Sequence, residues 1–149
     1  MKKKVAYFII AAVGLTAASI WSVSRNTWSA VSWDGFSDPE RGVGVAMTTW
    51  NAMHSGAHVE ETISTYSSLE NARLDFQVAL KGPGEIIDTT NAANSSSGDP
   101  ERAVKFFGNR DTREGDVEII TRRNNKLRFI SGGSLKVALA FEQAWVKLE

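Results

Sequence analysis

A long apolar stretch close to the N-terminus is the feature that most constrains this chain. Residues 5–23 form a run of 19 residues without a charged side chain, and Lys2, Lys3 and Lys4 directly precede it. At about 1.5 Å per residue a helix of this length spans about 29 Å, close to the ~30 Å hydrocarbon thickness of a bilayer. The remaining part of the chain, about 125 residues, is long enough for one domain with a modest core.

The apolar run predicts a segment that enters a membrane, since a lysine cluster on one side holds that side in the cytoplasm. We therefore expect a cytoplasmic N-terminus and a C-terminal domain outside, in the periplasm or the extracellular space. An uncleaved single-pass anchor and a cleaved signal peptide of a secreted protein both fit, because small residues such as Thr16 and Ala18 provide a cleavage site. The length of the run favours the anchor. The side chains expected in the membrane are Val5, Phe8, Ile9, Ile10, Val13, Leu15, Ile20 and Trp21.

This interpretation divides the chain into three parts. Residues 1–24 are the anchor or signal peptide, residues 25–37 are a juxtamembrane connector without clear periodicity, and residues 38–149 are a single exported domain. Residues 89–98, TTNAANSSSG, contain no apolar side chain larger than alanine and are expected to form a mobile loop.

The exported domain is expected to have an α+β fold with one or two helices and a mainly antiparallel sheet of about five strands. Asp38-Pro39-Glu40 and Asp99-Pro100-Glu101 both have the pattern of a capped helix N-terminus. The apolar residues Val59, Ile63, Tyr66 and Leu69 recur at helical spacing. Strict alternation of apolar residues over 74–81 predicts a strand, followed by a short second strand at 85–88.

The C-terminal third has the pattern of a β-meander. Strands are expected at 117–121 and 127–130, joined by a turn at Asn124-Asn125, because Asn tolerates the positive φ of tight turns. Alternation over 135–141 favours a third strand. A helix that begins at Ser134 is the alternative, because Val137, Phe141 and Leu148 also share a helical face.

Few residues have the spacing of a catalytic or metal site. His54, His58 and Glu61 would share one face of a continuous helix, but Gly56 interrupts them and no fourth ligand is evident, so they are weak metal candidates. The chain has no cysteine and no G-x-S-x-G nucleophile motif. The sequence therefore predicts a protein that is not an enzyme and that has no metal and no cofactor.

Charge is segregated along the chain. Residues 34–101 contain eleven acidic and three basic residues, a net charge of −8, whereas residues 102–128 contain eight basic and four acidic residues, a net charge of +4. The basic segment is expected to bind a polyanion or an acidic surface of a second copy. Its candidate residues are Arg110, Arg113, Arg122, Arg123, Lys126 and Arg128. Nucleic acid is not expected as a partner, because the exported part is net acidic and no aromatic residues are interleaved with the basic ones.

Three functions remain open from the sequence. The favoured one is a small membrane-anchored structural or assembly subunit of an envelope-associated or other membrane-associated complex, with protein partners or further copies of itself. The alternative is a secreted binding module for a polyanion or glycan. An exported hydrolase or metalloenzyme is the least favoured, because no set of residues provides its chemistry.

Overall fold

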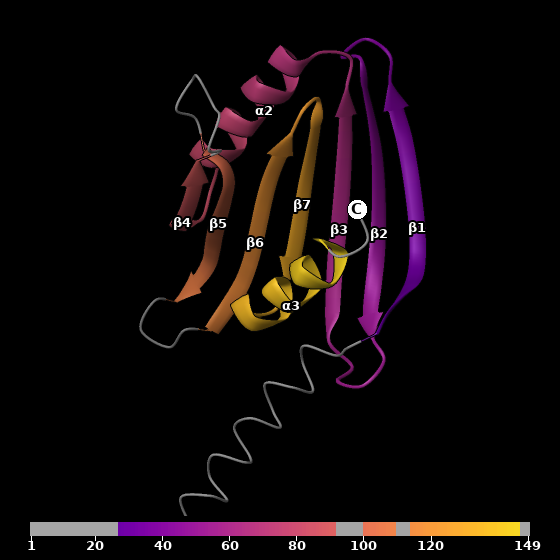
Figure 1. Ribbon diagram of the computed structural model, residues 1–149, viewed down its shortest axis with the longest axis vertical. Coiled ribbons are helices and arrows are strands. Elements are labelled where there is room, and N and C mark those ends of the chain that lie inside the picture. The colour runs from indigo at the N-terminus through magenta and orange to yellow at the C-terminus, as the bar shows by residue number, and fades with distance from the viewer. Residues whose placement is uncertain (1–26, 92–99, 110–113, 147–149) are drawn as a thin grey trace, which may run out of the picture.

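A computed structural model describes residues 27–91, 100–109 and 114–146, which form one antiparallel sheet and two helices (Figure 1). The sheet has seven strands in the order β1-β2-β3-β7-β6-β5-β4. The elements are, in chain order, β1 (Trp28–Asp38), β2 (Val43–Ala52), β3 (His58–Tyr66), α2 (Leu69–Lys81), β4 (Glu85–Asn91), β5 (Pro100–Asn109), β6 (Glu114–Arg123), β7 (Lys126–Gly132) and α3 (Leu135–Val146).

The sheet consists of two meanders joined by a helix. Strands β1 to β3 pair in sequence order, and so do β4 to β7. Helix α2 carries the chain from β3, in the middle of the sheet, to β4 at one edge, so that β7 returns to pair with β3. The first and last strands of this order, β1 and β4, are therefore the two edges.

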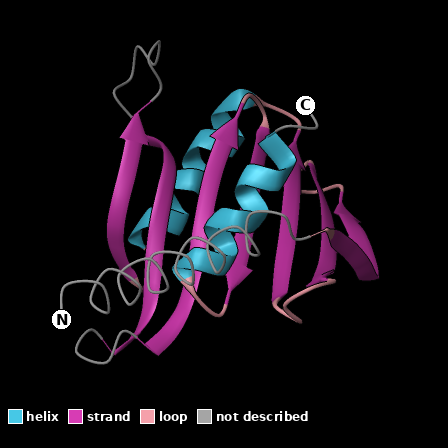
Figure 2. Cartoon of the chain, turned by 60° about the horizontal axis from the view of Figure 1, so that its bottom comes forward, coloured by secondary structure: helices cyan, strands magenta, loops and turns pink. Residues whose placement is uncertain are grey.

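The two helices cover opposite faces of the sheet (Figure 2). Successive side chains of a strand point to opposite faces, and Ile119 and Ile120 of β6 belong to different core clusters. Ile119 packs in the cluster of Phe141 from α3, whereas Ile120 packs in the cluster of Phe76 from α2. We call these sides the α3 face and the α2 face.

The expected fold class is wrong. The described residues form seven strands in place of the expected five, with two short helices, and no helix within the described ranges is long and apolar enough to cross a membrane. Residues 5–23, with all their expected membrane side chains, lie outside the described residues. So does most of the loop expected at 89–98, because β4 extends to Asn91. Most of the segment 25–37, expected to be a connector, belongs to β1.

The helix expected at Pro39 is a hairpin turn between β1 and β2. The Asp38 carboxylate accepts hydrogen bonds from the backbone N–H groups of Glu40 and Arg41, both at 3.1 Å, as a helix cap would. Gly42 then adopts φ 61°, and its N–H donates to the carbonyl of Pro39 at 3.3 Å. Asp38 therefore caps backbone N–H groups as predicted. The positive φ of Gly42 closes a turn, however, and no helix starts here.

Two expected helices and one expected strand in the middle of the chain were assigned to the wrong class. The segments beginning at Val59 and Pro100 are the strands β3 and β5, and the alternating segment 74–81 belongs to α2. In α2 only Ala72 and Phe76, four residues apart, are buried, while Leu74 and Val78 are exposed. The Ser68 side chain caps α2 by accepting the N–H of Asn71 at 3.1 Å. The exposed apolar residues produced the misleading alternation.

The last element is a helix, α3, and not the strand that was favoured. Ser134 accepts the N–H of Val137 at its hydroxyl, 3.3 Å, and the N–H of Ala138 at its carbonyl, 3.1 Å. Ala138 and Phe141 are fully buried against the sheet, which is the spacing of a helix face. Residues 117–121 and 127–130 do lie in strands, and Asn124 has φ 55° in the turn between them.

Candidate functional site

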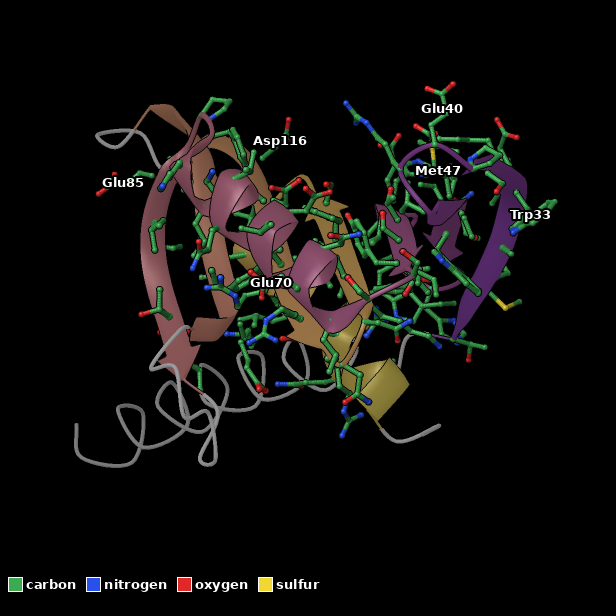
Figure 3. The ribbon with its side chains drawn as sticks, turned by 90° about the horizontal axis from the view of Figure 1, so that it is seen from above. Trp33, Glu40, Met47, Glu70, Glu85 and Asp116 are labelled. Atoms are coloured by element: carbon green, nitrogen blue, oxygen red, sulfur yellow. The ribbon has the colours of Figure 1, made fainter. Side chains whose placement is uncertain are left out.

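Strand β1 is an edge strand whose two faces are both open. It has 11 residues, and all but its two end residues are exposed. Trp33 is 72% exposed and Phe36 is 59% exposed, and Figure 3 shows Trp33 projecting from the outer edge of the sheet. We define the β1 edge surface as the exposed apolar residues of this hairpin, Val31, Trp33, Phe36 and Met47.

The β1 edge surface extends over both faces of the sheet. Trp33 pairs with Thr48, on the α3 face, whereas Phe36 pairs with Val45 and Met47 pairs with Asp34, on the α2 face. The helices do not cover these side chains, because the core clusters lie over the central strands. The outer hairpin is thus a two-stranded wing, and such a hairpin buries too little apolar surface to be stable on its own.

The two edges of the sheet differ in how well they are protected. Strand β4 is short, its pairing with β5 has two register shifts, and it carries Glu85 and Asp88. Strand β1 contains no Lys, Arg or Pro, the residues that most often block further pairing, and a β-bulge next to Ala30 is its main irregularity. A long unprotected edge with exposed aromatic side chains is typical of an interaction surface.

A buried carboxylate connects the hairpin wing to the centre of the sheet. The Glu61 side chain on β3 is 6% exposed and accepts two hydrogen bonds, from Arg128 Nε at 2.6 Å and from Trp50 Nε1 at 3.1 Å. The Arg128 guanidinium also lies 5.7 Å from the ring centre of Phe141 on α3. These contacts hold Glu61 and Arg128 together between β3 and β7.

A second ion-pair network ties α3 to the other half of the sheet. Arg102 on β5 donates to both Glu142 oxygens at 2.7 Å and to Asp88 Oδ2 at 3.1 Å. The hydrogen bonds to Glu142 raise the pKa of Arg102 above its usual value. In both networks an acidic residue of the segment 34–101 pairs with a basic residue of the segment 102–128. Part of the segregated charge is therefore balanced within one chain.

A pocket of about 810 Å³ lies at the tip of the β6–β7 hairpin. Arg102, Thr121 and Arg128 occupy one row of paired residues across β5, β6 and β7, and Ile63 continues this row on β3. We call this cavity the hairpin pocket. Its lining consists of Ile63, Glu101, Arg102, Thr121, Arg122, Arg123, Asn124, Asn125, Lys126, Arg128 and Glu142.

The structure brings together four of the six basic residues that the sequence singled out. Arg122, Arg123, Lys126 and Arg128 all line the hairpin pocket. Arg110 and Arg113 lie outside the described residues, and the strand ends that flank them, at Asn109 and Glu114, are at the opposite end of β6 from the Asn124 turn. Arg102 and Glu142 were missed, because their contact depends on α3 being a helix.

The three weak metal candidates do not converge. His54 lies in the turn between β2 and β3, and the ring of His58 is hydrogen-bonded to the Asn51 side chain. Glu61 is an odd number of residues from His58 on the same strand, so that the two point to opposite faces. Within the described part of the chain no group of three or more His, Asp or Glu side chains is placed to hold a metal ion.

No protein-family model, no curated protein and no solved structure matches this chain.

Proposed function

We propose that this chain is a small, non-enzymatic assembly subunit, held at a membrane by residues 5–23 and joined to a second copy of itself through strand β1. Cleavage of the N-terminal segment would leave the same domain as a secreted protein with the same edge. The single observation that carries the proposal is the open β1 edge with its exposed Trp33 and Phe36. An apolar edge of this kind is an aggregation hazard unless a partner covers it.

A second copy can pair with this edge around Trp33. In an antiparallel pairing centred on Trp33, Trp33 faces Trp33 of the second copy and Ser32 faces Asp34. The β-bulge between Ala30 and Ser32 interrupts this register, so the regular pairing is confined to the residues next to Trp33. Cross-strand aromatic pairs contribute about 0.2–1 kcal/mol each relative to an alanine pair. The two-fold arrangement is closed, as in most homodimers.

Charge also favours this register over a head-to-tail sheet. Asp34 faces Ser32, so that the carboxylates next to the two-fold axis do not meet each other. Pairing β1 of one copy with β4 of the next would place Asp34 and Asp38 beside a strand that carries Glu85 and Asp88. Like charges on facing residues are destabilising. Contact between the acidic segment and the basic hairpin is less favoured too, because Arg102 and Arg128 already pair within the chain.

The absence of cysteine from the chain allows a clean cross-linking test. One preparation of the full-length chain carries Ser32→Cys and a second, with a different tag, carries Asp34→Cys. Facing Cα atoms in an antiparallel pair lie about 4.5–5.5 Å apart, within reach of a disulfide. We expect oxidation of the mixture in an uncharged detergent to give a disulfide-linked heterodimer, detected on a non-reducing gel.

The matched control uses the other edge of the sheet. Ile87→Cys and Thr89→Cys are exposed positions of β4 with the same two-residue spacing, and their mixture should give little cross-linked product. Equal yields from the β1 and β4 pairs would show random collision and would sink the proposed dimer.

A charge placed at the centre of the edge gives an independent test. Trp33→Lys should shift the full-length chain from dimer to monomer in sedimentation velocity, because two lysines would face each other across the two-fold axis. Val78→Lys on α2 is the control, since Val78 is 67% exposed and lies outside the β1 edge surface. Both variants should unfold within about 0.5 kcal/mol of the wild type, as exposed substitutions usually do. A Trp33→Lys chain that stays dimeric contradicts the proposal.

A further inference from the structure

Two copies that pair through β1 have to enter the same bilayer from the same side, and this requirement sets how the sheet faces the membrane. We propose that helix α3 of each copy lies on the surface of the bilayer that residues 5–23 enter, with the sheet parallel to the membrane and the α2 face turned away from it. The inference rests on the anchor and the dimer proposed above, and it adds the surface that contacts the lipid.

The symmetry of the proposed dimer excludes an upright sheet. Antiparallel strands that face each other at Trp33 are related by a two-fold axis perpendicular to the sheet, because facing residues point to the same side. The two Trp28 residues then lie at opposite ends of the paired strands, ten strand steps or about 33 Å apart at ~3.3 Å per residue. Both chains can therefore enter one bilayer only if the axis follows the membrane normal, so that one face of the sheet is turned to the lipid.

The link between the apolar run and β1 is short enough to keep the sheet close to the bilayer. Five chain steps separate Val23, the last residue of the run, from Trp28, and they span at most about 18 Å. A helix with its side chains is about 10–12 Å thick. Little more than one layer of helix therefore fits between the sheet and the lipid. Because α2 and α3 cover opposite faces, only one of these helices can form that layer (Figure 2).

The outer side of α3 suits the interface of a bilayer. It carries residues that are exposed or half-buried, namely Leu135, Lys136, Leu139, Ala140 and Gln143. Three of these residues are apolar, one is cationic and none is acidic, which is typical of a helix that lies at the level of the lipid headgroups. The acidic residue of α3, Glu142, is held by Arg102. The long alkyl chain of Lys136 lets its ammonium group reach the phosphates.

Charge distinguishes the two faces of the sheet. The described strand side chains of the α3 face have a net charge of +1, because three acidic residues stand against Arg102, Arg123, Lys126 and Arg128. Those of the α2 face have a net charge of −4, because two basic residues stand against Asp34, Asp38, Glu60, Glu101, Asp116 and Glu118. The charges within each helix cancel. Anionic phospholipids therefore attract the α3 face and repel the α2 face, although Leu74 and Val78 of α2 are exposed too.

Fluorescence quenching in vesicles tests the contact, and the absence of cysteine from the chain allows one label per copy. The full-length chain with Gln143→Cys on α3, or with Val78→Cys on α2, is labelled with an uncharged nitrobenzoxadiazole dye. Each sample is reconstituted into vesicles of phosphatidylcholine and phosphatidylglycerol that contain a lipid with a nitroxide near its headgroup. We expect quenching of the Gln143 label to be at least about twofold stronger than that of the Val78 label, because α3 lies on the lipid and α2 lies beyond the sheet.

A charge change on each helix provides the matched variants. Leu135→Glu/Lys136→Glu should lower the quenching of the Gln143 label to the level of the Val78 label, because it makes the outer side of α3 acidic. Leu74→Glu/Lys81→Glu changes the net charge equally at exposed positions of α2 and should leave the Gln143 label quenched as before. The thermal midpoint of each variant shows that the fold is retained.

The anchor and the dimer are measured on the same vesicles, by flotation and by the cross-link between Ser32→Cys and Asp34→Cys. A chain that does not float with the vesicles contradicts the anchor and, with it, the contact of α3. Equal quenching of the two labels, or stronger quenching at Val78, in a chain that floats and cross-links through β1 would overturn the contact of α3 alone.

Discussion

Lys105 and Glu118 show how this fold accommodates charge beneath a helix. Lys105 on β5 is 1% exposed, and its Nζ donates to the carbonyls of Ala79 at 2.6 Å and Gly82 at 3.0 Å. Carbonyl groups at the C-terminal end of a helix carry partial negative charge, so a lysine there both satisfies them and stabilises the end of α2. Glu118 lies on the neighbouring strand β6, where it is paired with Lys105.

Glu118 should make the stability of the protein depend on pH. Burial raises the pKa of its carboxyl above 4.5, and the positive charge of Lys105 opposes this shift only in part. Between 4.5 and the raised pKa the folded state binds more protons than the unfolded state, so the free energy of unfolding falls as pH rises through this window. Glu118→Gln should therefore be more stable than the wild type at pH 7, and the difference should shrink towards pH 4.

Urea denaturation at a series of pH values measures this effect. Glu60→Gln, at an exposed position of β3, is the control and should stay within about 0.5 kcal/mol of the wild type at each pH. A Glu118→Gln variant that is less stable than the wild type at pH 7 would show that the pairing of Glu118 with Lys105 outweighs the cost of its burial.

Among the elements, α3 depends most on contacts from distant parts of the chain. Phe141 is fully buried, and its ring lies 5.0 Å from that of Trp28 on β1 and 5.7 Å from that of Trp50 on β2. The edge-to-face contact with Trp28 is the main apolar link between the hairpin wing and the core. This one helix residue holds the start of β1 in place.

Phe141→Ala should cost about 3–5 kcal/mol of unfolding free energy, the usual cost of removing a buried aromatic ring. It should also reduce the near-ultraviolet circular dichroism of the tryptophans, because Trp28 and Trp50 lose their common partner. Leu135→Ala on the same helix is the control, since Leu135 is 38% exposed. Loss of stability in both variants to the same extent would show that helix propensity, and not the Phe141 contacts, is responsible.

Sequence patterns predicted single elements well only where local chemistry decides the structure. The hairpin turn at Asn124 is a local feature that the residue types alone indicated. Asp38 and Ser134 were recognised as capping residues, but Asp38 caps a turn and not the expected helix, and a strand was favoured after Ser134 where α3 forms. The classes of α2, β3 and β5 depend on which apolar residues are buried. Leu74 and Val78 are exposed, so their presence in an alternating pattern predicted a strand where α2 forms.

The surfaces on which function is proposed were predictable to different extents. Arg123 and Lys126 of the α3 face are close in sequence, so the basic hairpin was evident before the structure. The β1 edge surface was not, because residues 25–37 lack a regular pattern: a strand exposed on both faces has no buried side to enforce one. Arg102, Glu142 and Glu61 meet their partners only through the sheet order, which no local signal gives.

At the scale of the whole molecule, the described sheet and helices share two core clusters. Both clusters, as far as the structure describes them, are built from side chains between Trp28 and Phe141. The ion pairs Arg102–Glu142 and Arg128–Glu61 join distant strands and α3 within the same range. The membrane-entering segment proposed at residues 5–23 is therefore expected to add location and not stability.

Removal of residues 1–26 should leave a folded domain and change only where it is found. The shortened chain should unfold at the same thermal midpoint as the full-length chain in detergent, because it keeps both clusters and every described strand. After cell fractionation and an alkaline carbonate wash, we expect the full-length chain in the membrane pellet and the shortened chain in the supernatant.

Val13→Arg in the full-length chain should reduce insertion, since a charge at the centre of the span costs about 2.5–3.5 kcal/mol. Release of the unaltered full-length chain by carbonate would contradict the anchor and leave the secreted form, whereas unfolding of the shortened chain would place residues 1–26 in the core of the domain.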